Sequence, residues 1–218
     1  MISESWGVMA ELPIAGRRVY SVAEDTSSQI NTSGLGDMTI MGMYTGLRPD
    51  RSIGLLAGVI LPTGRFNVAG LERDTQLGTG ATQIVLGGYY LGALNESNTL
   101  NYFLQGRYQA PVLTQDSYRP GAEAFLIAGL AYNLGSFGPV TRFAPVLQAI
   151  YQWRASDSGS NSDPANTGLQ RAMIAPGIDV RAGQFRLFAD VQIPVWQWVR
   201  GNQLVPEVLF RVQGSYQF

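Results

Sequence analysis

The last fourteen residues of the chain, VPEVLFRVQGSYQF, alternate between apolar and polar side chains with a period of two. Every second residue from Val208 onward is uncharged: Val208, Phe210, Val212, Gly214, Tyr216 and Phe218. The residues between them are mostly polar: Glu207, Leu209, Arg211, Gln213, Ser215 and Gln217. Successive side chains of a β-strand point to opposite faces, so this period predicts a strand with one apolar and one polar face. The strand by itself does not indicate which face points inward.

The same period recurs along the whole chain and predicts ten strands. Their expected ranges are 3–13, 36–47, 53–63, 79–92, 98–112, 121–134, 140–154, 169–182, 184–197 and 205–218. Strands of this length exceed the five or six residues that are usual in soluble sheets and fit a tilted crossing of a bilayer. We therefore expect a single all-β domain over residues 1–218.

The expected connections alternate between long and short. Longer loops are predicted at 14–35, 64–78, 113–120, 155–168 and 198–204, and short turns lie between them at 48–52, 95–98, 135–138 and Gly183. Successive connections of an antiparallel meander lie at opposite ends, so all the longer loops fall on one side. Bacterial outer-membrane barrels show this asymmetry, with short periplasmic turns and longer external loops. An even number of strands then places both termini on the periplasmic side.

Composition favours a membrane barrel over a soluble sheet. Charged residues make up 14% of the chain and hydrophobic residues 45%, whereas roughly 25% of residues are charged in typical soluble domains. Along 140–154, 169–182 and 184–197 the polar face consists mainly of arginines, glutamines and carboxylates, which can pair with one another. We therefore predict an antiparallel up-and-down transmembrane β-barrel of about ten strands, with apolar side chains toward lipid and polar ones toward a lumen.

The residue types that are missing limit the chemistry of the chain. Histidine and cysteine are absent and every basic residue is an arginine, so no His base, thiolate or Ser–Lys pair is available. The carboxylates Asp179, Asp190 and Glu207 have arginines nearby in the sequence, which favours salt-bridged filling of the interior over a glycosidase pair. We expect no enzymatic activity and no cofactor. The net charge of −1 gives no electrostatic case for nucleic-acid binding.

One loop has a weak similarity to a calcium-binding loop. The stretch DSGSNSD, residues 157–163, spaces potential oxygen ligands at every second residue. It lacks the closing bidentate glutamate of such loops, so the sequence favours a flexible polar loop and we expect no metal site.

The polar faces supply the candidate lumen-lining residues, which are arginines, carboxylates and two glutamines. They are Glu11, Asp37, Gln105, Arg107, Glu123, Arg142, Gln148, Arg154, Arg171, Asp179, Arg181, Arg186, Asp190, Glu207 and Arg211. Positive and negative charges are nearly balanced in this set. Such a balance favours a cross-linked polar interior or a narrow selective constriction over a broad aqueous pore.

Two resemblances to known proteins add to this interpretation. The last strand, which ends with Tyr216 and Phe218, resembles the terminal strand of bacterial outer-membrane proteins, and this implies recognition by the barrel-assembly machinery. SGLGDMTIMGMY (33–44), GLLAGVILPTGR (54–65), GTGATQIVLGGYY (78–90) and NYFLQGRYQAPV (101–112) resemble a family of outer-membrane barrels labelled for the MetA pathway of phenol degradation. This second resemblance covers residues 33–218 and implies a transporter. Family members start with additional strand sequence, so the resemblance implies up to twelve strands in a complete barrel.

These observations leave three hypotheses of different classes to compare. The first is an outer-membrane channel or transporter for small solutes, including aromatic or hydrophobic compounds, that contacts lipid with its outer face. The second is a closed structural barrel that binds partners through the loops 14–35, 64–78 and 155–168. The third is a soluble lipocalin-like carrier, which the strand lengths and the terminal Phe218 disfavour. The opening residues MISESWG lack the regions of a signal peptide, so an exported chain is expected in mature form or without its leader. The oligomeric state is left open.

Overall fold

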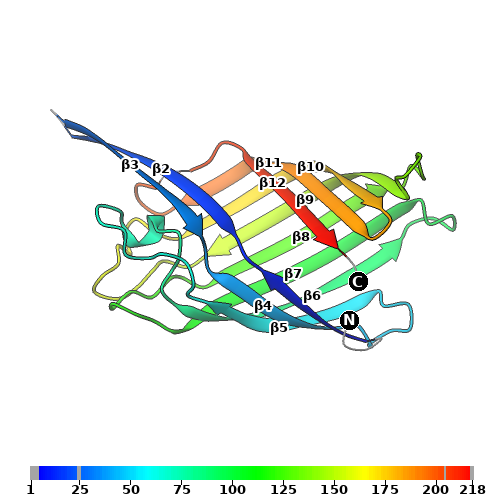
Figure 1. Ribbon diagram of the computed structural model, residues 1–218, viewed down its shortest axis with the longest axis horizontal. Helices are drawn as coiled ribbons and strands as arrows, with labels where there is room; N and C mark the ends of the chain where they lie inside the picture. The colour runs from blue at the N-terminus through cyan, green and yellow to red at the C-terminus, as the bar shows by residue number, and fades with distance from the viewer. Residues whose placement is uncertain (1–4, 24–25, 204, 217–218) are drawn as a thin grey trace.

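The computed structural model describes residues 5–23, 26–203 and 205–216. Within these ranges the chain is almost entirely β-structure, with ten antiparallel strands in one continuous sheet and a separate two-stranded hairpin (Figure 1). The strand order in the large sheet is β1-β4-β5-β6-β7-β8-β9-β10-β11-β12. Among the described residues, no helix is both long enough and apolar enough to cross a bilayer.

Each predicted strand segment corresponds to one strand of the large sheet. The strands are β1 (Trp6–Glu11), β4 (Met38–Tyr44), β5 (Ile53–Leu61), β6 (Thr82–Ala93), β7 (Leu100–Leu113), β8 (Glu123–Tyr132), β9 (Arg142–Arg154), β10 (Leu169–Ala182), β11 (Phe185–Val199) and β12 (Leu209–Tyr216). The remaining elements are β2 (Ile14–Ala23), β3 (Thr26–Leu35) and a short 3-10 helix, η1 (Arg73–Thr75). The predicted antiparallel all-β architecture is therefore confirmed.

The prediction of a long loop at 14–35 is wrong. These residues form the β2–β3 hairpin, which pairs from Ile14↔Leu35 to Ala23↔Thr26. Only two residues separate β1 from β2, and two separate β3 from β4, so the hairpin prolongs the β1–β4 pair beyond the rim of the large sheet (Figure 1). The segment is rich in Ser, Thr and Val and contains no proline, so its backbone can form a ladder although its side chains alternate poorly.

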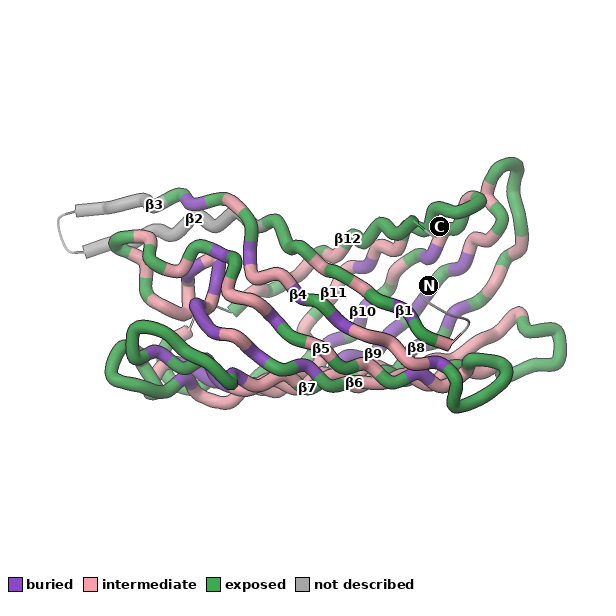
Figure 2. Tube along the Cα trace, turned by 60° about the horizontal axis from the view of Figure 1, so that its bottom comes forward, coloured by how far each residue is buried: buried purple, intermediate pink, exposed green. Residues whose placement is uncertain are grey.

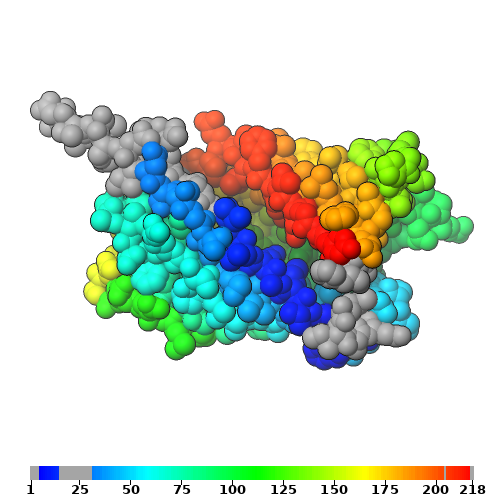
Figure 3. Space-filling model, viewed as in Figure 1, coloured from blue at the N-terminus to red at the C-terminus, as the bar shows by residue number. Residues whose placement is uncertain are grey.

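The large sheet curls into a half-barrel (Figures 1 and 2). Its edge strands, β1 and β12, are not paired with each other within the described ranges. In the space-filling view these two edges border a hollow, and the strands behind it are visible on its floor (Figure 3). Strand β1 begins and strand β12 ends at the end of the half-barrel that carries the short turns, and the longer connections lie at the opposite end (Figure 1).

Side chains alternate between the two faces of the sheet. Along β9, the buried residues Val146, Gln148 and Ile150 alternate with the exposed residues Leu147 and Tyr151. The other strands likewise expose large apolar side chains on one face, among them Leu55, Leu86, Leu104, Leu126, Ile174, Leu187, Phe210 and Val212. This apolar face is what a lipid-exposed barrel wall requires.

The polar face is the concave one. Arg107 of β7 lies 3.5 Å from Glu11 of β1, and Gln148 of β9 lies 2.8 Å from Asp190 of β11, although neither pair of strands is adjacent in the sheet. Side chains of strands that are not neighbours can meet only on the inside of the curve. The inner face is nevertheless not purely polar, because it contains two small apolar clusters. These are Met41, Ile60 and Val85 in one, and Ile150, Met173 and Ala175 in the other.

The C-terminal strand is described as far as Tyr216. This residue pairs with Phe185 across the β11–β12 ladder, and the two ring centroids are 4.7 Å apart. Phe218 lies outside the described residues. The use of Tyr216 and Phe218 as an assembly signal therefore stays a prediction.

Candidate lumen site

The strands place most of the predicted lumen residues on the concave face. The set on strands comprises Glu11 on β1, Gln105 and Arg107 on β7, Glu123 on β8, Arg142, Gln148 and Arg154 on β9, Arg171, Asp179 and Arg181 on β10, Arg186 and Asp190 on β11, and Arg211 on β12. Alternation puts them on one face because directly paired residues of adjacent strands share a face and residues two apart along a strand do as well.

A buried polar cluster lies on β9, β11 and β12. Asp190 is 4% exposed as a residue, and its carboxylate forms an ion pair with Arg211 across the β11–β12 ladder. Gln148 Nε2 donates to Asp190 Oδ2 at 2.8 Å, and Arg211 Nη2 donates to Gln148 Oε1 at 3.4 Å. The Arg211 guanidinium also lies 5.1 Å from the ring centroid of Phe188. The Asp190 carboxylate, the Arg211 guanidinium and the Gln148 amide are therefore linked to one another in the interior, as a cross-linked wall requires.

A second pair lies toward the end with the short turns. Arg186 donates through Nε to Asp179 Oδ1 at 2.7 Å and through Nη2 to Asp179 Oδ2 at 3.3 Å. Two parallel hydrogen bonds of this kind fix both geometry and charge. Arg142 and Arg181 lie beside Arg186 in the same row of the sheet, since the register pairs Arg181 with both. No ion pair is formed by Arg142 or Arg181 in the described part of the chain.

The opposite wall contributes one ion pair. Arg107 Nη1 of β7 lies 3.5 Å from Glu11 Oε2 of β1, and both side chains are partly exposed. Gln105 is two residues away on the same face of β7 and is exposed. The structure therefore brings Glu11 and Arg107 together and leaves the Gln105 side chain open to the interior.

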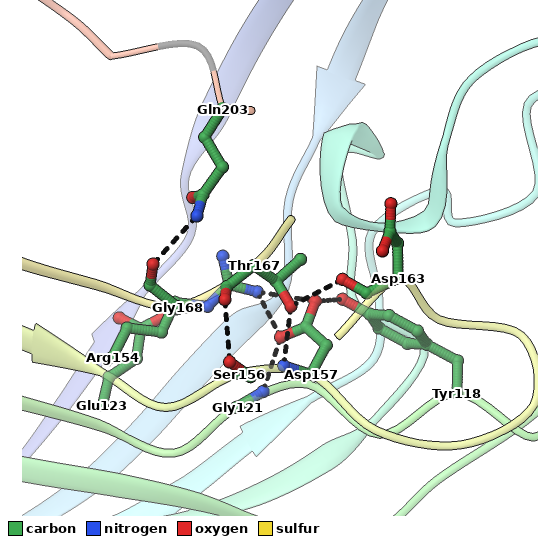
Figure 4. Close-up of polar contacts among 10 residues, drawn as sticks. All are labelled: Tyr118, Gly121, Glu123, Arg154, Ser156, Asp157, Asp163, Thr167, Gly168 and Gln203. Carbon is green, nitrogen blue, oxygen red and sulfur yellow. Dashed lines mark hydrogen bonds and ion pairs between the residues drawn. The ribbon is translucent and has the colours of Figure 1, made fainter. Parts of the chain in front are cut away.

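At the end with the longer connections, polar side chains tie the loops to the sheet (Figure 4). Arg154 lies 3.5 Å from Glu123 and 2.8 Å from Asp157, whose side chain has no exposed surface. The same carboxylate accepts hydrogen bonds from the Tyr118 hydroxyl at 2.6 Å and from the Gly121 backbone N–H at 2.8 Å. We call Tyr118, Glu123, Arg154 and Asp157 the loop cluster.

The loop that contains Asp157 is held by further hydrogen bonds. The Asp157 N–H donates to Thr167 Oγ1 at 2.9 Å, and the Ser156 hydroxyl donates to the Thr167 carbonyl at 2.8 Å (Figure 4). Asp157, at the start of the predicted polar loop, is therefore held by an arginine, by a backbone N–H and by a threonine hydroxyl. In the described residues no group of three or more His, Cys, Asp or Glu side chains is arranged to hold a metal ion.

Tyr118 connects the loop cluster to η1. Burial of its ring, together with the hydrogen bond to Asp157, raises the pKa of the Tyr118 hydroxyl above its ordinary value of 10.0. The Arg73 guanidinium lies 4.7 Å from the centroid of the Tyr118 ring and 4.8 Å from that of Phe66. These cation–π contacts join the connection that contains η1 to the loop between β7 and β8.

Two predicted lumen residues are placed elsewhere. Asp37 lies between β3 and β4, where Oδ2 accepts hydrogen bonds from the Thr79 N–H and hydroxyl, each at 2.7 Å, and Oδ1 accepts one from the Gly64 N–H at 2.9 Å. It anchors a loop at the rim. Glu207 is exposed in the segment that precedes β12. It belongs to none of the groups above.

Sequence reasoning did not identify Tyr118 or Asp157 as partners. They lie in different loops, 39 residues apart, and neither lies in a strand. The one available signal was Asp157 at the start of the serine-rich stretch 157–163, next to Arg154 at the end of a predicted strand.

Two comparisons relate the chain to known proteins, one by sequence and one by structure. The sequence matches the family described as "Putative MetA-pathway of phenol degradation" over residues 5–200. The structure is similar to that of the COG4313 outer membrane channel from Pseudomonas putida F1, with a TM-score of 0.67 and 14% sequence identity. The match covers 98% of this chain and 77% of that channel, and at this identity it shows the fold alone. No curated protein matches the sequence.

Proposed function

The chain belongs to the MetA-pathway phenol-degradation family, and from this premise we propose that it is a bacterial outer-membrane channel for small solutes, with a lumen lined by arginines and carboxylates. The fold is that of an outer-membrane channel. The proposal includes solutes with an aromatic or hydrophobic body, in keeping with the description of the family. It places the outer face in lipid and both termini in the periplasm, because β1 begins and β12 ends beside the short turns (Figure 1).

The observation that carries the proposal is the separation of the two faces. The outer face exposes large side chains such as Leu104, Phe210 and Val212. The inner face contains the ion pairs Arg211–Asp190 and Arg186–Asp179 together with partly exposed polar groups. Mixed charged groups around a narrow path can select small solutes by charge and by hydrogen bonding.

Conduction in reconstituted membranes tests the proposal. We expect the folded chain in planar bilayers to pass a small ion current and the chain in liposomes to admit small solutes. Heat-modifiable migration on gels verifies that a folded barrel is present in each sample. Absence of both current and solute flux from a folded sample would contradict the proposal.

A second candidate function is the binding of a partner through the external loops. It is supported by the loop cluster and by Arg73, which join three connections into one ordered surface. Shortening the stretch 158–166, which leaves Asp157 and Thr167 in place, distinguishes the two functions. Loss of a partner interaction with unchanged permeability would favour loop binding, whereas unchanged binding would favour the channel.

The proposal assigns no catalytic step to the chain. The interior carboxylates Asp179 and Asp190 are each paired with an arginine. These contacts support a role in shaping the lumen. Recognition of the last strand by the barrel-assembly machinery also remains a proposal.

A further inference from the structure

Arg171 is the buried arginine of the inner wall whose charge is not compensated. Its relative exposure is 7%, and in the described part of the chain it has no ion pair and no side-chain hydrogen bond. Its Nε atom is buried without a hydrogen-bond partner, as are those of Arg154 and Arg211, so the missing ion pair is what sets Arg171 apart. Removing a guanidinium from water without a counter-charge is unfavourable, so such a group favours the binding of an anion.

The row of the sheet that contains Arg171 offers further polar groups. The register pairs Arg171 with Gln152 of β9 and with Gln197 of β11, and it pairs Gln152 with Phe125 of β8. Directly paired residues share a face, so all four side chains lie on the inner wall. Gln197 is exposed, and Gln152 and Phe125 are partly exposed, so the row is open to the interior.

The next row of the same wall is apolar. It contains Ile150 and Met173, which are each 4% exposed and form a cluster against which Ile127 packs. These residues are two positions from Gln152, Arg171 and Phe125 along their strands, so they adjoin the polar row on one side. A ligand at this place meets a cation and two amides at one end, and the partly exposed side chains of Phe125 and Ile127 at the other.

The electrostatics of the wall favour the approach of anions from the end with the short turns. Arg142, Arg181 and Arg186 form one row across β9, β10 and β11, and only Arg186 has an ion pair, with Asp179, in the described residues. Three cations beside one carboxylate leave an excess of positive charge there. Such an excess raises the local concentration of anions.

We infer that Arg171, with Gln152 and Gln197, forms a binding site for a small carboxylate whose body is flat and apolar. The carboxylate accepts two hydrogen bonds from the guanidinium, and the amide groups orient it. The apolar body lies against Phe125 and Ile127, which are both partly exposed. This inference rests on the proposed channel function, since it names the class of solute that the lumen takes.

Binding of benzoate to the full chain in detergent, measured by isothermal titration calorimetry, tests the site without requiring conduction. We expect Arg171→Gln to weaken benzoate binding by roughly ten- to a hundredfold, as loss of charged hydrogen bonds does. Arg48→Gln removes the same charge from an exposed turn and should bind benzoate as the unchanged protein does. Acetate, which lacks the ring, and benzyl alcohol, which lacks the charge, should both bind more weakly than benzoate.

A second variant keeps the inference testable if Arg171→Gln does not fold. Gln152→Leu retains the guanidinium and should weaken benzoate binding by a few-fold. The inference is overturned if the unchanged protein does not bind benzoate, or if every folded variant of the row binds it as the unchanged protein does. Arg171-dependent binding in a protein that passes no current supports the site and contradicts the channel. Current without such binding contradicts only the site.

Discussion

Arg154 and Arg171 lie on neighbouring strands of one inner wall, yet their surroundings differ completely. Arg154 is held by Glu123 at 3.5 Å and by Asp157 at 2.8 Å. Arg171 is 7% exposed and has no ionic partner among the described residues. This wall therefore uses arginines in two ways. One joins loops to the sheet and stabilises the fold, whereas the other remains available to an anion at a cost in stability.

The largest expected effect follows from neutralising Asp157, the nearer of the two carboxylates that contact Arg154. Asp157→Asn should lower the free energy of unfolding by about 3–5 kcal/mol, because it neutralises the fully buried carboxylate that Arg154 and Tyr118 both contact and leaves Arg154 only the longer contact to Glu123. Urea titration of the chain folded in lipid vesicles measures this change. Asp163→Asn alters an exposed carboxylate of the same loop and serves as the control. Equal stability of the two variants would mean that the loop cluster contributes little.

Breaking the Asp190–Arg211 ion pair should have a smaller effect on stability. It should leave Arg211, like Arg171, without a counter-charge. Asp190→Asn leaves Arg211 without its ion pair, but 35% of the Arg211 side chain is exposed, so we expect a loss of about 1–2 kcal/mol. The added positive charge should also shift the reversal potential in a salt gradient toward that of the anion. Gln213→Asn on β12 is the control that leaves the charges unchanged. A shift of the reversal potential toward the equilibrium potential of the cation would contradict a position of Asp190 beside the path of the ions.

Neutralising Arg171 and neutralising Arg154 should change the free energy of unfolding in opposite directions. Arg171→Gln removes an uncompensated buried charge, so the free energy of unfolding should stay unchanged or rise by about 1 kcal/mol. Arg154→Gln should lower it, because Asp157 and Glu123 then lose their partner. The same urea titration compares both variants. A matching loss in the two variants would remove the distinction on which the comparison depends.

The smallest expected effect concerns the pH dependence of the loop cluster. The pKa of Tyr118 is raised in the folded state by burial and by Asp157, so its contribution is present below the unfolded pKa of about 10. It should be lost as the pH rises through the higher folded value. Tyr118→Phe should cost about 1 kcal/mol at pH 8 and should remove this alkaline component. Thermal unfolding at pH 8 and pH 11 of both proteins checks this, and an identical alkaline loss in the variant would assign the effect to another group.

Much of the fold could be predicted from the period of two. It located all ten strands of the large sheet and correctly separated an apolar face such as Leu147 and Tyr151 from a polar face such as Gln148. It missed the β2–β3 hairpin, because Ser, Thr and Asn in 14–35 resemble a loop in composition while their backbone pairs in register. The apolar clusters on the inner face were also missed, since alternation describes the polarity of a strand and not the packing between strands.

The candidate site was predicted only as a set of residues. The sequence places Arg154 and Arg171 on polar faces, but which carboxylate each one meets depends on the register across several strands. The contact between Gln148 and Asp190 spans a whole intervening strand. Tyr118 and Asp157 meet because two loops fold over the rim, and no periodicity reports on that. The sequence therefore could not distinguish the compensated arginine from the uncompensated one.

The orientation of the two faces can be measured most directly with single cysteines, because the chain contains none of its own. Gln105 and Leu104 are adjacent on β7 and both exposed, but they lie on opposite faces. In liposomes, Gln105→Cys should react with a charged, water-soluble thiol reagent, and Leu104→Cys should be shielded by lipid. A fluorophore attached at Leu104→Cys should be quenched by brominated lipid. Reaction of the Leu104 variant with the water-soluble reagent, together with lipid quenching at position 105, would contradict the account.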